Sequence, residues 1–235
     1  MRLRLALVVA LAFAVLASCA SYFDSRAEAA LREALARVVG PAASYEVEVS
    51  GASLDGARFE RVRFVGTRIA RARTPVLDRL ELELRGVAVD RKEKRLTALA
   101  AANGTLLIRA GDLADHLRER GWVDDARVVL EPPDRIAISG TPRISGLPLP
   151  VRDGVELRGR LVAQGAQLRL VVDGVRVGGA QAPPLVRALL ERAVNPLFDA
   201  TPYPLPARFD SVAVDGDAIR ISASGSRLAS ELVTP

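Results

Sequence analysis

Apolar and polar side chains alternate over long stretches of this chain, and no other feature limits its possible folds as strongly. The alternation is clearest over residues 45–49, 80–89 and 168–177. Successive side chains of a β-strand point to opposite faces, so these segments predict strands with one buried and one solvated face. Sheets with one solvated face are antiparallel. The phase of the alternation slips near Gly66 and again at Gly86, which predicts a bulge at each position.

Three segments have helical spacing instead. A capping box at residues 25–28 and the stop signal Gly40-Pro41 bound an amphipathic helix. A second, short helix is expected to begin with Asp112 as its cap. A third is expected to begin at Pro183-Pro184, because proline is favoured in the first helical turn. Long strands with a few helices predict an α+β fold whose sheet is mostly antiparallel.

Four dipeptides predict turns between strands: Asn103-Gly104, Pro132-Pro133, Asp173-Gly174 and Asp215-Gly216. Asp173-Gly174 has the clearest hairpin pattern. No linker rich in glycine and serine interrupts the chain, so residues 19–235 are expected to form a single domain.

The N-terminus has the pattern of an export signal. Arg2 and Arg4 precede an uninterrupted apolar run over residues 5–17, which is too short for a membrane-spanning helix of about 20 residues. Leu16-Ala17-Ser18-Cys19 resembles a bacterial lipobox, which implies that residues 1–18 are removed and that Cys19 carries acyl chains of the palmitate type. The alternative is ordinary cleavage after Ala20. Lipidation predicts a protein anchored to the cell envelope, on the outer membrane facing the periplasm if the cell has two membranes.

Basic residues concentrate in one part of the chain. Residues 58–95 hold twelve Arg or Lys against six Asp or Glu, and removal of Arg2 and Arg4 lowers the net charge from +5 to +3. A nucleic-acid partner is not expected, because aromatic residues are only 4% of the chain and the protein is exported. Arginine pairs with phosphate in a bidentate geometry, so anionic lipid headgroups are a candidate partner. The alternative is that these arginines form the solvated face of alternating strands.

The residues needed for catalysis or metal binding are scarce. His116 is the only histidine and is expected to be an exposed residue of the short helix. One histidine and one cysteine cannot supply a zinc site, and no nucleophile motif or phosphate-binding glycine loop is present. Trp122 is either a membrane-interface anchor or a core residue. We therefore expect no catalytic residue, no metal and no cofactor.

The order of elements resembles a known family. The strand at 80–90, the helix start at 111–113, the strand at 168–177, the helix at 184–198 and Pro204-Leu205-Pro206 resemble the LmeA-like phospholipid-binding proteins of bacterial envelopes. The resemblance covers most of residues 45–224. It implies a long, curved, mostly antiparallel sheet wrapped around or packed on a few helices, with an apolar groove for acyl chains. A lipobox is a departure from the family, in which a plain signal or an anchor helix is common.

These observations favour a non-enzymatic lipoprotein that binds, carries or senses membrane phospholipid. Acyl chains are expected between the first and last helices and the inner face of the sheet, and phosphate is expected at arginines of residues 58–73. The lining candidates are Leu31, Leu35, Val38, Leu185 and Leu189, and the headgroup candidates are Arg61, Arg63 and Arg68. A dry core would have the same pattern. The alternative function is that of a structural or assembly lipoprotein, which docks an unknown protein partner and binds no lipid.

Overall fold

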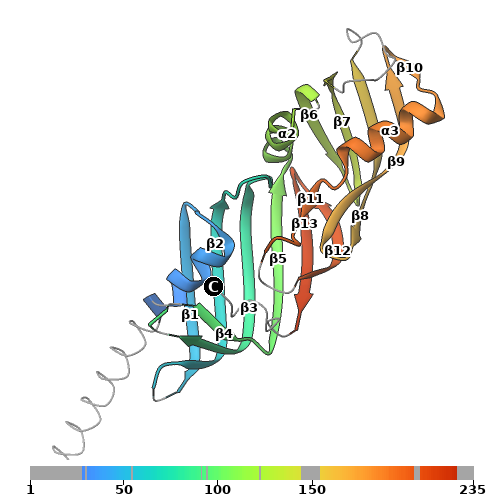
Figure 1. Cartoon of the computed structure of the whole chain (residues 1–235). Helices are drawn as coiled ribbons and strands as arrows, with labels where there is room; N and C mark the ends of the chain where they lie inside the picture. The colour runs from blue at the N-terminus through green and yellow to red at the C-terminus, as the bar shows by residue number, and fades with distance from the viewer. Residues whose placement is uncertain are drawn as a thin grey trace, which may run out of the picture.

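The computed structural model describes residues 28–226, apart from 30, 54, 91, 94, 122, 144–153 and 204–206. The signal segment, Cys19 and Trp122 lie outside these residues. Two antiparallel sheets follow one another along an elongated molecule (Figure 1). The α+β class and the antiparallel pairing are therefore confirmed, whereas the wrapping of a sheet around a helix stays a prediction.

The first sheet contains the N-terminal and C-terminal strands of the described chain. Its order is β1 (Ser44–Ala52), β2 (Arg58–Ile69), β3 (Leu77–Asp90), β5 (Ala101–Arg109), β13 (Ala218–Gly225) and β12 (Arg208–Asp215), with β4 (Arg95–Ala98) paired to β3. The second sheet has the order β10 (Ala180–Gln181), β9 (Gln167–Val177), β8 (Val155–Gln164), β7 (Arg135–Pro142) and β6 (Val123–Glu131), with β11 (Phe198–Asp199) paired to β9. Every strand pair is antiparallel.

The two sheets meet along β12. The Phe209 amide donates to the carbonyl oxygen of Gly165 at 2.7 Å, and the Val214 amide donates to that of Pro133 at 2.6 Å. Helix α2 (Ala110–Glu119) continues directly from β5 and packs against β6. Buried side chains of both sheets form one hydrophobic cluster.

One face of the first sheet, which we call the inner face, carries its buried apolar side chains. It includes Val47, Phe64, Leu80, Leu106 and Ile221, all 8% exposed or less. Polar residues alternate with them on the outer face, as the sequence predicts. Residues 28–29 and 31–39 are helical, and this N-terminal helix lies over β1 and β2 (Figure 1).

Helix α3 (Pro184–Val194) packs on β9. Val186, Leu190 and Val194 face the core. The Asn195 side chain fixes the end of the helix, since its Oδ1 accepts from the Leu170 amide at 2.7 Å and its Nδ2 donates to the Leu170 carbonyl oxygen at 2.8 Å.

Two of the predicted turns are wrong. Asn103-Gly104 lies inside β5, and Asp173-Gly174 lies inside β9. The β8–β9 hairpin turns instead at Gly165, where φ is +60°. Glycine in a strand interior marks a close approach by a neighbour as often as it marks a turn, and at Gly104 the neighbour is a leucine. The turns at Pro132-Pro133 and Asp215-Gly216 are confirmed.

The irregularity predicted near Gly66 lies at Arg68. Gly66 pairs regularly with Tyr45 and Leu80, whereas Arg68 has a φ of 51°. The slip at Gly86 is confirmed: its φ is +59°, and the buried positions change phase around it. Among the described residues, no helix is long and apolar enough to cross a membrane.

Candidate functional site: an apolar groove on the inner face

A groove crosses the inner face of the first sheet where β3, β5, β13 and β12 lie side by side. It encloses about 610 Å³ of space free of atoms, including the part open to solvent. The lining is almost entirely apolar and comes from Val39, Leu77, Leu80, Leu82, Ala102, Asn103, Gly104, Leu106, Phe198, Ala200, Tyr203, Ala207, Phe209, Ala223 and Ser224.

Small residues on adjacent strands form the floor of the groove. In the strand register Leu82 lies opposite Gly104, and Gly104 lies opposite Ala223. A Cβ atom on Gly104 would lie 2.7 Å from a methyl carbon of Leu82, so Leu82 already occupies the place of the missing side chain. With Ala102 beside Gly104, the side chains along these strands are too short to fill the inner face.

The wall opposite the sheet is the segment at residues 198–203. Phe198 stacks on Phe209 with ring centroids 5.8 Å apart, and it meets Tyr203 edge to face at 6.1 Å. The Ala200 amide donates to the carbonyl oxygen of Ala166 at 2.9 Å, which ties the wall to the β8–β9 turn. Aromatic pairing of this kind and backbone bonding give the groove a fixed wall.

Arg71 lies at the rim of the groove. Its guanidinium is 4.6 Å from the centroid of the Tyr203 ring, and it donates to the carbonyl oxygens of Val38 at 2.8 Å and Pro202 at 3.2 Å. These contacts are to π-electrons and carbonyl dipoles. Among the described residues no carboxylate forms an ion pair with Arg71, so its charge is not neutralised.

A polar hollow adjoins the groove and shares Phe198 with it. Arg73, His116 and Arg120 line this hollow, together with Glu119 and Asp199. Within the described part of the chain, neither Arg73 nor Arg120 has an ion-pair partner. Arg120 donates to the carbonyl oxygen of Pro196 at 2.8 Å.

Hydrogen bonds hold one acid of the hollow, Asp199. Burial raises the pKa of the Asp199 carboxyl, but hydrogen bonds from Thr201 and Gln167 outweigh it and hold the pKa below its ordinary value. Asp199 is thus already bonded to neutral donors, from Thr201 of the wall segment and Gln167 of β9.

Comparison with protein families identifies the chain. A family model described as LmeA-like phospholipid-binding matches residues 19–224. The chain belongs to the LmeA-like phospholipid-binding family. No curated protein and no solved structure matches it.

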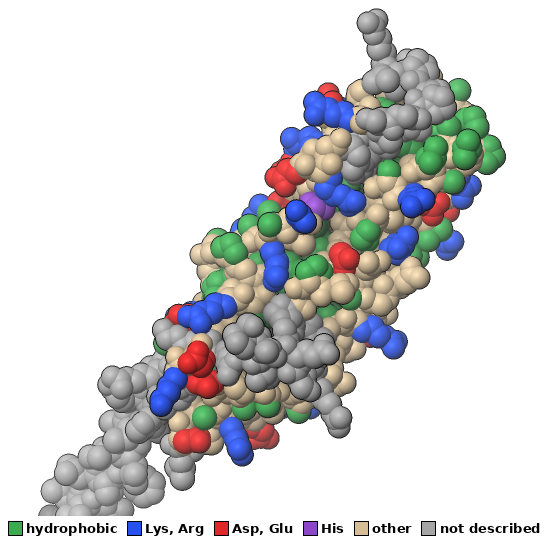
Figure 2. All heavy atoms as spheres, viewed as in Figure 1, with side chains coloured by type: hydrophobic (Ala, Val, Ile, Leu, Met, Phe, Trp, Pro, Cys, Tyr) green, Lys and Arg blue, Asp and Glu red, His purple; other side chains and the backbone are tan. Residues whose placement is uncertain are grey.

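His116 is buried, and the prediction that it is exposed is wrong. Only 4% of its surface is accessible. It lies three residues after Leu113, about one helical turn, and is therefore on the buried face of α2. Burial lowers the pKa of His116 to about 4, and the nearby charge of Arg120 acts in the same direction. Figure 2 shows the histidine, in purple, between basic side chains.

The stability of this LmeA-like protein should depend on pH through His116. The unfolded histidine takes up a proton near pH 6.5, whereas the folded one does so only near pH 4. The neutral, buried histidine therefore costs the folded state nothing above pH 6.5. The free energy of unfolding falls as the pH drops from 6.5 toward 4, because the unfolded state binds a proton that the folded state does not. Between pH 7 and pH 5 the free energy of unfolding should fall by about 2 kcal/mol from this group.

Denaturant unfolding at both pH values, on wild type and on His116→Leu, measures this contribution. The chain has no other histidine, so the variant should lose most of the pH dependence in this window. An equal change in the free energy of unfolding between the two pH values in both proteins would contradict the low pKa of His116.

The structure separates the residues predicted to line the groove. Leu31 and Leu35 are completely buried, and Val38 is half-buried against the core. From this helix only Val39 reaches the groove.

The prediction that Leu185 and Leu189 face the interior is wrong, since they are 70% and 41% exposed. Helix α3 turns the adjacent stripe of Val186, Leu190 and Val194 inward, so the two leucines cannot line the groove described here.

The headgroup prediction for Arg61, Arg63 and Arg68 stays a prediction, and the structure pairs each of these arginines with acids away from the groove. Arg61 and Arg63 lie on the outer face, each 3.5 Å from a carboxylate oxygen, of Glu83 and Glu48 respectively. A count of basic residues along the chain does not predict these partners, because Glu83 and Glu48 come from the strands on either side of β2.

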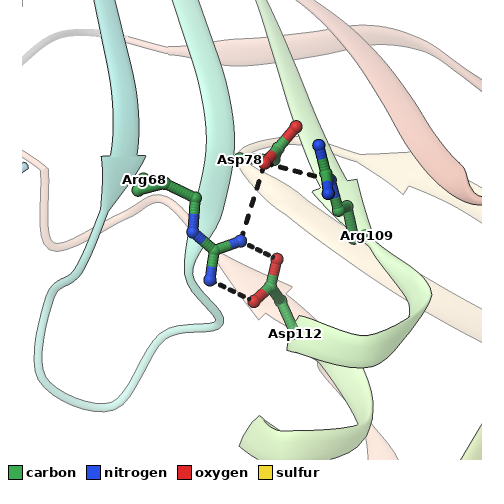
Figure 3. A network of polar contacts seen from close by, with 4 residues as sticks. All are labelled: Arg68, Asp78, Arg109 and Asp112. Carbon is green, nitrogen blue, oxygen red and sulfur yellow. Dashed lines mark hydrogen bonds and ion pairs between the residues drawn. The ribbon is translucent and has the colours of Figure 1, made fainter. Parts of the chain in front are cut away.

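Arg68 belongs to a separate network that joins strands β2, β3 and β5 to the start of helix α2 (Figure 3). It donates to both carboxylate oxygens of Asp112, at 2.6 and 2.8 Å. Asp78 lies 3.6 Å from Arg68 and 3.0 Å from Arg109. Asp112 is therefore a salt-bridge partner and not the helix cap that the sequence predicts, and α2 begins without a side-chain cap. Two arginines and two aspartates cancel in charge within this network.

In the part of the chain that the structure describes, no cluster of histidine, cysteine or acidic residues could hold a metal ion. The residues that line the groove and the polar hollow come from segments far apart in the sequence. Gly104 within a strand was the one local signal for the groove, because glycine there indicates a missing side chain.

Proposed function

We propose that this protein is a non-enzymatic phospholipid-binding protein whose groove holds acyl chains and whose rim holds the phosphate. The observation that carries the proposal is the placement of unpaired arginines beside an apolar groove. Tyr203 lines the groove under Arg71, and Phe198 separates the groove from the hollow of Arg73 and Arg120. An amphipathic lipid needs this arrangement of an apolar slot with cations at its mouth. Membership of a phospholipid-binding family supports the same ligand class.

Arg73 is the rim residue best suited to contact a headgroup. It lies in the tight turn between β2 and β3 with a φ of 65°, a conformation that residues other than glycine rarely adopt. Backbone strain of this kind is often found at ligand sites. Its exposed side chain has no described acidic partner, so it is available for a phosphate oxygen.

Reversing the charge of Arg73 should weaken the binding of anionic phospholipid about tenfold, since a charge-assisted bond to phosphate is lost and a repulsion is added. The measurement is a titration of Arg73→Glu with a fluorescent phosphatidylglycerol at low and high salt. Arg61→Glu is the matched control, because Arg61 lies on the outer face beside Glu83. A loss of binding in Arg61→Glu and not in Arg73→Glu would move the headgroup to the outer face and contradict this proposal.

The proposal includes a lipid anchor at Cys19 that holds the protein to the cell envelope as a carrier or sensor. Cys19→Ser should lose partitioning into the detergent phase in a phase-separation assay, because one or more acyl chains would be absent. A variant that partitions like wild type would contradict the anchor and would leave the groove unaffected.

A further inference from the structure

The surface of helix α3 carries an apolar patch that the fold leaves uncovered. Among the described residues four large apolar side chains are well exposed, and two of them, Leu185 and Leu189, are one turn apart on this helix. Residues four apart lie on the same helical face, so the two leucines form one continuous surface. Ala188 and Arg192 are exposed beside them.

Basic residues outnumber acids in the chain around this patch. Residues 174–190 include Arg176 and Arg187 and no Asp or Glu. The one acid of the helix, Glu191, is half-buried. Figure 2 shows hydrophobic side chains gathered at the end of the molecule where α3 and β10 lie. Exposed leucines flanked by arginines and not by acids match the surface of a bilayer that contains anionic lipid.

We propose that α3 docks on an anionic phospholipid bilayer, with Leu185 and Leu189 inserted at the level of the headgroups. The helix is at the opposite end of the molecule from the N-terminal helix (Figure 1), so this contact is separate from any anchor at Cys19. Its C-terminal end leads through residues 195–197 to Phe198, a wall residue of the groove. Docking places that wall next to a membrane. The inference does not depend on what the groove binds.

An environment-sensitive probe tests the docking at one residue. The full chain with Cys19→Ser and Leu185→Cys is labelled with the fluorophore NBD and mixed with vesicles of phosphatidylcholine with or without phosphatidylglycerol. We expect a blue shift and quenching by brominated lipids with the anionic vesicles. The control is the same label at Val129→Cys, since Val129 is 55% exposed on β6. That label should stay in water even if another part of the chain binds the vesicle.

A second variant tests the two leucines with the probe moved to a neighbouring residue. Leu185→Asp with Leu189→Asp should reduce the anionic-vesicle affinity of α3 about tenfold, measured by quenching of a probe at Ala188→Cys. A probe at residue 185 that stays aqueous with both vesicle types would overturn the docking proposal. Uptake of a fluorescent phospholipid, measured on the same samples, shows whether the groove binds lipid independently of that outcome.

Discussion

Replacing Ala223 with tryptophan should abolish most phospholipid binding and leave the fold intact. Ala223 lines the groove opposite Gly104, and neither residue has a side chain long enough to fill the inner face. An indole there occupies space that the proposal assigns to an acyl chain. Each buried methylene contributes about 0.8 kcal/mol, so excluding about four of them should weaken binding roughly 100-fold. The measurement pairs lipid titration with thermal unfolding of the same lipid-free protein.

The adjacent residue gives the matched control. Ser222 is on the same strand and points to the outer face, so Ser222→Trp adds the same side chain on the other side of the sheet. It should keep both lipid affinity and melting temperature. If Ala223→Trp instead binds lipid normally and is destabilised by about 1–3 kcal/mol, the groove is a packed core that tolerates no added volume.

Truncating Leu35 should cause a large loss of stability, although the sequence assigns this residue to lipid contact. Leu35 is completely buried in the hydrophobic cluster. Leu35→Ala should therefore lower the free energy of unfolding by about 2–5 kcal/mol, as is typical of cavity-forming substitutions. Denaturant titration of the lipid-free protein measures this loss.

Leu185→Ala is the corresponding control on α3, because its side chain is 70% exposed. It should change stability by about 0.5 kcal/mol or less. A small effect at Leu35 that grows when phospholipid is added would show that Leu35 contacts lipid after all.

Local patterns in the sequence predict most of the elements of this fold. Alternation over 80–89 and 168–177 corresponds to β3 and β9, because one-sided burial produces a period of two. Helical spacing predicts α2 and α3 for the same physical reason with a period of 3.6. These elements depend only on which neighbours along the chain are apolar.

The errors occur where a distant segment decides the outcome. Helix α3 carries two apolar stripes, one through Leu185 and one through Val186, and only contact with β9 selects the second. His116 is polar, yet it is buried where α2 meets the C-terminal part of the chain. Arg68 pairs with Asp112, which is 44 residues away in the sequence. Sequence periodicity carries no information on such pairings.

The groove itself is a product of tertiary structure. Its floor needs Gly104 of β5 and Ala223 of β13 in register, and its wall needs residues 198–203. The resemblance to the family predicts a groove, but the lining candidates chosen from helix faces are not among the residues that line the groove on the sheet. Strand register, which places Gly104 beside Ala223, was the missing information.

Native mass spectrometry of the full-length protein, purified in mild detergent, tests whether the groove holds phospholipid. Wild type should carry a species heavier by the mass of one phospholipid, which tandem fragmentation identifies by its headgroup and acyl ions. Ala223→Trp, purified in parallel, should be free of it, and Ser222→Trp should retain it. Equal phospholipid on all three proteins, or none on wild type after lipid is supplied, would contradict the groove as the binding site. The second of these results would favour a structural lipoprotein.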